Sequence, residues 1–168
     1  EVALYLLSPQ RRADTNASGD GGGEALAGMK GVVFVDDAHE KVILLRRSMR
    51  VIPLAQCGIA LSERFTFFDQ VHTTGMDIPQ SVTAQAVLTL GKGMVFRDYA
   101  QGAYRMRKLG LGQTINLFII REVNNLVKKE IGKATRVSPV DDGGDDTGGG
   151  GGERQLLVDV CGWLVVNA

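Results

Sequence analysis

The sequence predicts an α/β protein in which helices cover a mostly parallel sheet. Between residues 65 and 120, short apolar runs bounded by turn-forming residues alternate with a stretch of helical periodicity, and this alternation is typical of parallel sheets. The 168 residues, 44% of them hydrophobic and 23% charged, suffice for a buried core. Two cysteines without zinc-ligand spacing indicate a reducing compartment and a core stabilised by packing.

The first elements are expected after a polar segment, residues 1–30, which is predicted to be flexible because it has little apolar surface to bury. The apolar runs 31–37 and 41–46 flank an acidic turn and predict two strands joined as a hairpin. Pro53 lacks an N–H donor, so the next apolar run is an edge strand or a loop. We expect a short helix within residues 55–64.

In the second half of the sequence, short apolar runs typical of strands alternate with apolar residues spaced three and four apart, as in helices. The predicted strands cover residues 65–68, 85–90 and 114–120, and the predicted helices cover residues 95–109 and 121–131. Gly110 and Gly132 are expected to end the two helices. Residues 31–133 are therefore predicted to form one domain.

A second polar stretch, residues 134–153, combines acidic residues with a run of glycines and is predicted to be a linker. Residues 154–168 show helical apolar spacing and are expected to begin a further helical module. The chain starts with Glu1 and stops within an apolar stretch, so we expect it to be a piece of a longer protein.

The charge balance narrows the classes of partner. Nineteen basic and nineteen acidic side chains cancel, so no overall positive charge draws the chain to nucleic acid or to an anionic membrane. No apolar run reaches the roughly 18 residues that a membrane span needs, and the N-terminus lacks a secretory signal pattern. We therefore expect an intracellular protein, cytoplasmic or nuclear, with no membrane partner.

Two motifs suggest chemistry at a sheet edge. A glycine, an aspartate and a proline follow the strand predicted at 65–68, and a glutamine with basic residues lies on the helix predicted at 95–109. A carboxylate at a strand end can bind a ribose hydroxyl, and guanidinium groups can stabilise a transferring phosphoryl group. The order and spacing resemble the second RecA-like lobe of superfamily-two helicases. This resemblance implies nucleotide-facing roles for Gly75, Asp77, Gln101, Arg105, Arg107 and Lys108.

The motifs also depart from the helicase pattern. Tyr104 stands where the helicases have glycine, the spacing to the second arginine is one residue short, and Asp69 replaces a threonine. No phosphate-binding loop accompanies the motifs. The chain is therefore expected to be a degenerate NTPase-like domain that does not hydrolyse nucleotide by itself.

A longer match covers residues 31–120 and the tail 159–163. The runs 69–77 and 105–110, together with the apolar strands around them, resemble very large eukaryotic proteins classed as ubiquitin thioesterases, which are ubiquitinyl hydrolases related to the OTU deubiquitinases. The resemblance implies that the parent protein is a thiol-dependent hydrolase whose partner is ubiquitin or a ubiquitinated protein. The alternative is the second lobe of an active nucleic-acid-dependent NTPase, with a phosphate-binding lobe upstream; a pure interaction domain is a third hypothesis.

Within the chain itself, Cys57, His72 and Asp69 supply the residue types of a nucleophile, a base and an orienting carboxylate. No family motif surrounds Cys57, so a small buried hydrophobe is the competing and favoured interpretation, and no catalytic residue is assigned. Cys161 and Trp163 are expected in the core, and His39 is expected to be solvated in its acidic turn.

Two further ligand classes are disfavoured. A metal site assembled from Asp36, Asp37, His39 and Asp69 fits no known ligand spacing, so no metal and no cofactor are predicted. Basic side chains can touch the phosphates of RNA, but neutral net charge and few aromatic residues offer no stacking platform. The cluster in question is Arg97, Arg105, Arg107 and Lys108.

Overall fold

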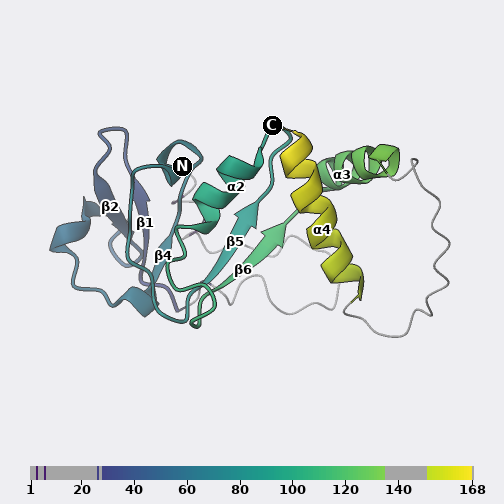
Figure 1. The fold of residues 1–168 in the computed structure, drawn as a ribbon. Coiled ribbons are helices and arrows are strands. Elements are labelled where there is room, and N and C mark those ends of the chain that lie inside the picture. Colours follow the sequence, from purple (N-terminus) through teal and green to yellow (C-terminus); the bar gives the residue numbers. More distant parts are fainter. Residues whose placement is uncertain (1–2, 4–5, 7–25, 27, 135–150, 168) are drawn as a thin grey trace, which may run out of the picture. The chain divides into compact units, whose positions relative to one another are not determined.

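The computed structural model describes residues 3, 6, 26, 28–134 and 151–167. The chain divides into two compact units, Glu1–Ala84 and Gln85–Ala168, and Figure 1 shows the elements of each. Each unit has its own sheet and its own buried apolar cluster. The predicted domain boundaries at residues 30, 133 and 153 remain predictions.

The first unit contains a four-stranded sheet in the order β3-β2-β1-β4. Its strands are β1 (Gly31–Val35), β2 (Lys41–Leu45), β3 (Val51–Pro53) and β4 (Arg64–Thr66). The β1–β2 and β2–β3 pairs are antiparallel, and only β1–β4 is parallel. The predicted hairpin and the edge strand at Pro53 are confirmed, but the expected mostly parallel sheet is wrong here, because the short turns that join β1 to β2 and β2 to β3 allow only antiparallel pairing.

Alternate side chains of this sheet enter two apolar clusters. Val33 and Ile43 are fully buried and pack with Ile78, whereas Val32 and Leu44 point to the opposite face. β4 is only half-buried, in contrast to the buried strand predicted there. At Gly31 an added Cβ would lie 2.8 Å from the backbone oxygen of Leu44, so the β1–β2 contact depends on this glycine.

The helix expected within residues 55–64 is replaced by two 3₁₀ turns, η1 (Leu54–Gln56) and η2 (Leu61–Glu63). Arg64 explains the interruption. Its Nε donates to the backbone oxygen of Ile59 at 2.7 Å, and its guanidinium also reaches the backbone oxygen of Cys57. These bonds hold the residues between the two turns away from a helical path. A third 3₁₀ turn, η3 (Val71–Thr73), follows β4.

The second unit is built around two parallel strands, β5 (Gln85–Thr89) and β6 (Thr114–Phe118). The helix α2 (Phe96–Ala103) connects them, and α3 (Arg121–Ala134) follows β6. This parallel pair with its crossover helix confirms the α/β pattern in part; a RecA-like lobe is not established by it.

Both predicted helix ends in this unit are wrong. α2 ends at Ala103 rather than at Gly110, because the chain turns to bury Met106 and the Gln113 side chain accepts a hydrogen bond from the backbone N–H of Lys108 at 2.7 Å. α3 continues through Gly132, where a Cβ would meet open space. Glycine weakens a helix by only about 1 kcal/mol, so it does not by itself stop one.

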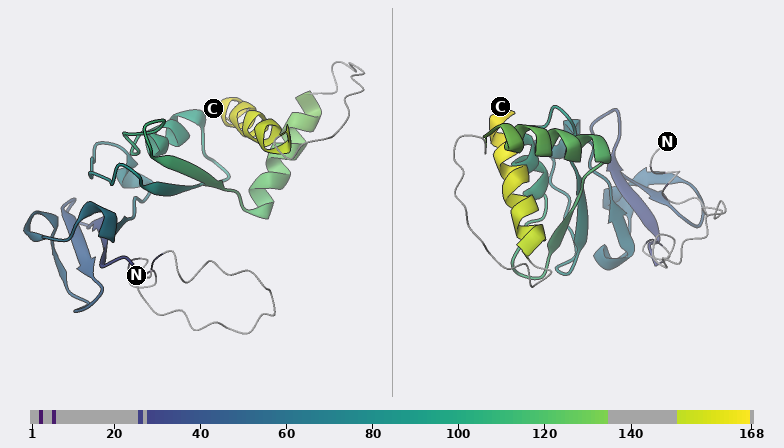
Figure 2. Two further views of the ribbon diagram at one scale, coloured as in Figure 1. Left: turned by 90° about the horizontal axis from the view of Figure 1, so that it is seen from below. Right: turned by 90° about the vertical axis from the view of Figure 1, so that its right-hand side faces the viewer.

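The helix α4 (Gly151–Val166) completes the core of the second unit. Val160, Trp163 and Leu164 pack with Val123 and Val127 of α3, and Figures 1 and 2 show the two helices side by side. This segment was expected to begin a further module. Its first three residues, 151–153, belong to the predicted linker. Residues 135–150 lie outside the described part of the chain, as does most of the segment 1–30.

Trp163 is buried as expected, whereas Cys161 is exposed and not in the core. Among the helices in the described ranges, none has the length and apolar content to cross a membrane.

Candidate functional site

The hairpin turn between β1 and β2 holds His39 in an unusual backbone conformation. The carboxylate of Asp36 accepts hydrogen bonds from the backbone N–H groups of Ala38 at 3.0 Å and Glu40 at 2.9 Å. The backbone oxygen of Asp36 accepts a hydrogen bond from the backbone N–H of His39. His39 has φ 61°, the left-handed region that glycine or asparagine occupies at lower cost. A strained position filled by an imidazole suggests that the side chain itself has a use.

Asp69 and His72 form a tight pair around η3. Oδ1 of Asp69 accepts the backbone N–H of His72 at 2.8 Å, and Oδ2 lies 2.7 Å from Nδ1 of the ring. Burial works to raise the pKa of Asp69, but the hydrogen bonds and the charge of His72 outweigh it, so the pKa of this carboxyl falls below 3.8. Two of the three residues predicted as a nucleophile, base and carboxylate set are thus in contact.

The second nitrogen of His72 meets His39. Nε2 of His72 and Nδ1 of His39 are 3.0 Å apart, and the rings meet edge to face with centroids 5.2 Å apart. The interaction links the hairpin turn to the loop after β4. His72 is 14% exposed, whereas His39 is an exposed residue.

An open groove of about 530 Å³ lies beside His39. Four of its eight lining residues are apolar. The charged lining residues are two cations, Lys41 and Arg64, and one carboxylate, Glu40. The lining residues are His39, Glu40, Lys41, Pro53, Leu54, Ala55, Arg64 and Pro79. Asp69, His72 and His39 therefore form a chain of hydrogen-bonded groups, which begins at a partly buried carboxylate and ends at the wall of the groove. All three residues belong to the first unit.

Cys57 is not joined to this chain of groups. Its Sγ accepts the backbone N–H of Ile59 at 3.4 Å, and its side chain packs against the apolar cluster of Val33 and Ile43. In the described residues no hydrogen bond links Cys57 to Asp69 or His72. A thiolate–imidazole pair is therefore not formed in this conformation, and the predicted three-residue site stays a prediction.

The residues predicted to face a nucleotide are divided between the two units. Gly75, with φ 80°, and Asp77 belong to the first unit; the other four belong to the second. Of these, Gln101 lies on α2, and the basic residues Arg105, Arg107 and Lys108 follow the helix in a series of turns. Asp77 and Arg105 also follow strands of two different sheets, so the expectation that both belong to one sheet is wrong.

The turns after α2 are closed by Gln113, the buried polar side chain of this part of the structure. Its Oε1 and backbone N–H both bond Lys108, and Gly110 and Gly112 have positive φ values of 76° and 122°. The expected basic helix face is replaced by a compact glycine loop that leads into β6.

The loop after β5 is hydrogen-bonded to the residue that follows α4. Nδ2 of Asn167, just after α4, donates to the backbone oxygens of Met94 at 2.9 Å and Lys92 at 3.2 Å. Ligands of open α/β sheets bind beyond the carboxyl ends of the strands. In this unit, that place is bonded to a side chain of the protein itself.

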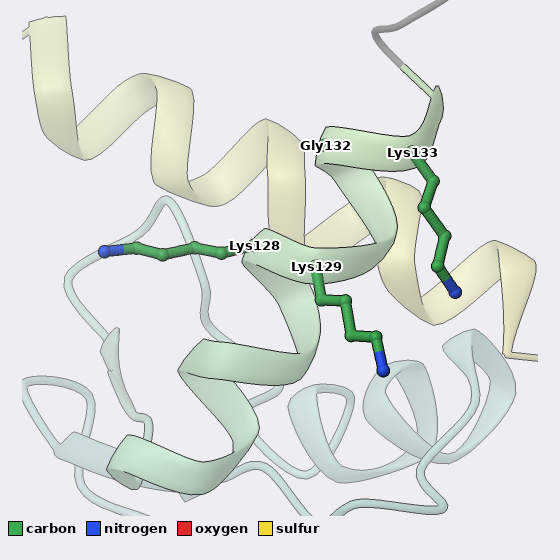
Figure 3. Close-up of a pocket in the computed structure, with 4 residues that line it drawn as sticks. All are labelled: Lys128, Lys129, Gly132 and Lys133. Atoms are coloured by element: carbon green, nitrogen blue, oxygen red, sulfur yellow. The ribbon is translucent and has the colours of Figure 1, made fainter.

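A basic surface on α3 surrounds a second hollow, of about 380 Å³. Figure 3 shows Lys128 pointing away from Lys129 and Lys133, and Lys133 is 2.7 Å from Glu130. Because the three ammonium groups do not converge, the surface is better explained as the solvated face of a helix. The described residues also contain no group of three or more His, Cys, Asp or Glu side chains placed to hold a metal.

Sequence reasoning considered His39 only as a solvated turn residue or a disfavoured metal ligand, and it did not consider Asn167. Nothing in the spacing indicates that two histidines 33 residues apart meet; a non-glycine residue at the end of a tight hairpin turn was the only available signal.

Comparison with family models, with curated proteins and with solved structures finds no match to this chain.

Proposed function

We propose that this chain is a segment of an intracellular, thiol-dependent ubiquitinyl hydrolase-like protein, and that it serves there as a helicase-like scaffold without nucleotide turnover. The parent's partner is then ubiquitin or a ubiquitinated protein. The assignment to such a parent is supported by the runs 69–77 and 105–110, which resemble that class over consecutive residues.

The scaffold role is supported chiefly by Asn167. Its two hydrogen bonds tie the end of α4 to the loop that follows β5, the loop at which an α/β domain of this type would meet a ligand. A second observation agrees with this. Arg105 donates from Nε to the backbone oxygen of Gln101 at 3.4 Å, so it turns back toward α2 rather than extending from a helix face.

A labelling experiment on the parent protein tests the hydrolase assignment. Ubiquitin with a C-terminal electrophile is expected to label a cysteine, and labelling is expected to persist when Cys57→Ser and Cys161→Ser are combined. Loss of labelling in the double variant would place the nucleophile in this chain and contradict the scaffold role. If the parent is not labelled at all, the hydrolase assignment fails.

A second experiment distinguishes the scaffold from a working NTPase lobe. ATP turnover by the parent is expected to be unchanged when Arg105→Ala and Arg107→Ala are combined. Arg97→Ala, which removes an exposed arginine of α2, is the matched control. A working lobe would lose turnover in the double variant but not in the control, because a finger arginine contributes several orders of magnitude to phosphoryl transfer.

A further inference from the structure

The hydrogen-bond pattern around His72 fixes the positions of the protons. Asp69 is ionised at neutral pH, since its pKa lies below 3.8, so its carboxylate can only accept, and Nδ1 of His72 must donate to it. Neutral His72 then carries a lone pair on Nε2. That lone pair can accept a hydrogen bond only if Nδ1 of His39 bears the proton, which leaves the lone pair of His39 on Nε2.

Nε2 of His39 is available to the groove. The ring is exposed, it lines the groove, and in the described residues no hydrogen bond involves this nitrogen. The hairpin keeps His39 in its left-handed conformation through the Asp36 carboxylate, and the edge-to-face contact with His72 orients the ring. A base that is oriented by a second group, itself held by a carboxylate, has the arrangement of general-base sites.

We propose that Asp69, His72 and His39 form a proton relay that makes Nε2 of His39 the general base of the groove, and that the groove takes an anionic acyl ester. Lys41 and Arg64 against the single carboxylate of Glu40 give the lining a positive balance that favours an anion. The apolar residues of the lining, Leu54 and Ala55 among them, suit the acyl chain.

The chemical step is a hydrolysis. Nε2 of His39 takes a proton from water while the water oxygen bonds the carbonyl carbon. The tetrahedral intermediate expels the alkoxide or phenolate as the C–O bond breaks. His39 then passes its Nδ1 proton to Nε2 of His72, so the positive charge comes to lie on His72, beside the carboxylate of Asp69. In the reverse transfer the extra proton leaves from Nε2 of His39 to solvent or to the leaving group.

Nuclear magnetic resonance tests the relay directly, because the chain contains two histidines and both belong to it. At about pH 8, above the ordinary histidine pKa, long-range ¹H–¹⁵N spectra are expected to show both rings with the proton on Nδ1. Asp69→Asn should reverse both rings, since an amide can donate to Nδ1 of His72. Asp37→Asn, which removes an exposed carboxylate of the same hairpin, should reverse neither. A proton on Nε2 of His39 in the unaltered chain overturns the relay.

Ester hydrolysis tests the base and the ligand class. The 4-nitrophenyl half-ester of glutaric acid is the anionic probe and 4-nitrophenyl acetate the neutral one. The unaltered chain is expected to prefer the anionic ester, and Lys41→Met to lose that preference. Because general-base catalysis contributes about 10²–10⁴-fold, His39→Asn, which tolerates the left-handed backbone, should lower the rate at least tenfold. A rate unchanged by His39→Asn overturns the base, and equal rates for the two esters overturn the anionic acyl assignment.

Discussion

Truncating the side chain of Leu164 should destabilise the second unit far more than truncating the side chain of its neighbour Val165. Leu164 is fully buried among residues of α3 and β5, whereas Val165 is 61% exposed one position along α4. Leu164→Ala deletes three buried carbons, about 2.4 kcal/mol at roughly 0.8 kcal/mol each. The cavity left behind raises the total to about 3–5 kcal/mol. Val165→Ala should cost less than about 0.5 kcal/mol.

The assay uses the single tryptophan of the chain, Trp163, which is buried in the same cluster. Its fluorescence during urea unfolding reports the second unit alone. A loss of about 3 kcal/mol with a slope of about 1.5 kcal/mol per molar urea lowers the midpoint by about 2 M. Equal midpoints for Leu164→Ala and Val165→Ala would refute the docking of α4 on α3.

Three further outcomes follow from the structure. The stability contributed by ionised Asp69 is present above its unfolded pKa of 3.8 and is lost as the pH falls through its lower folded pKa, so Asp69→Asn should flatten the acid limb of a pH–stability profile followed by circular dichroism. Gly31→Ala should lower stability by about 1–3 kcal/mol in thermal unfolding, because the new Cβ would lie 2.8 Å from backbone, whereas Gly58→Ala, which meets open space, should not show that clash. Burial, and secondarily the charge of Cys161, raises the pKa of Tyr99 above 10.0; ultraviolet titration should therefore show delayed ionisation, and stability should fall as the pH rises past about 10.

The sequence predicted the local elements well and their ends poorly. The β1–β2 hairpin and the parallel β5–β6 pair follow from apolar runs bounded by turn formers, a pattern that depends on neighbours in the chain. The end of α2 did not follow from such a pattern. Apolar spacing continues past Ala103, but Met106 is buried through a turn and not through another helical residue.

Contacts between residues far apart in the chain could not be predicted from the sequence. The apolar spacing of α4 indicates a buried face, but only the folded chain shows that this face meets α3. The same limit applies to the candidate site. Asp69 and His72 are three residues apart and were paired in advance as chemistry, whereas His39 joins them across 33 residues because a hairpin turn reaches the loop after β4.

The late position of α4 has a consequence for biosynthesis. Leu90 belongs to the same cluster as Leu164, so the core of the second unit needs a residue that leaves the ribosome 74 positions after Leu90. Until then Val123 and Val127 present an uncovered stripe on α3, which is the kind of surface that chaperones hold. The nascent chain should accordingly reach protease resistance in this unit in one late step, after residue 164 emerges.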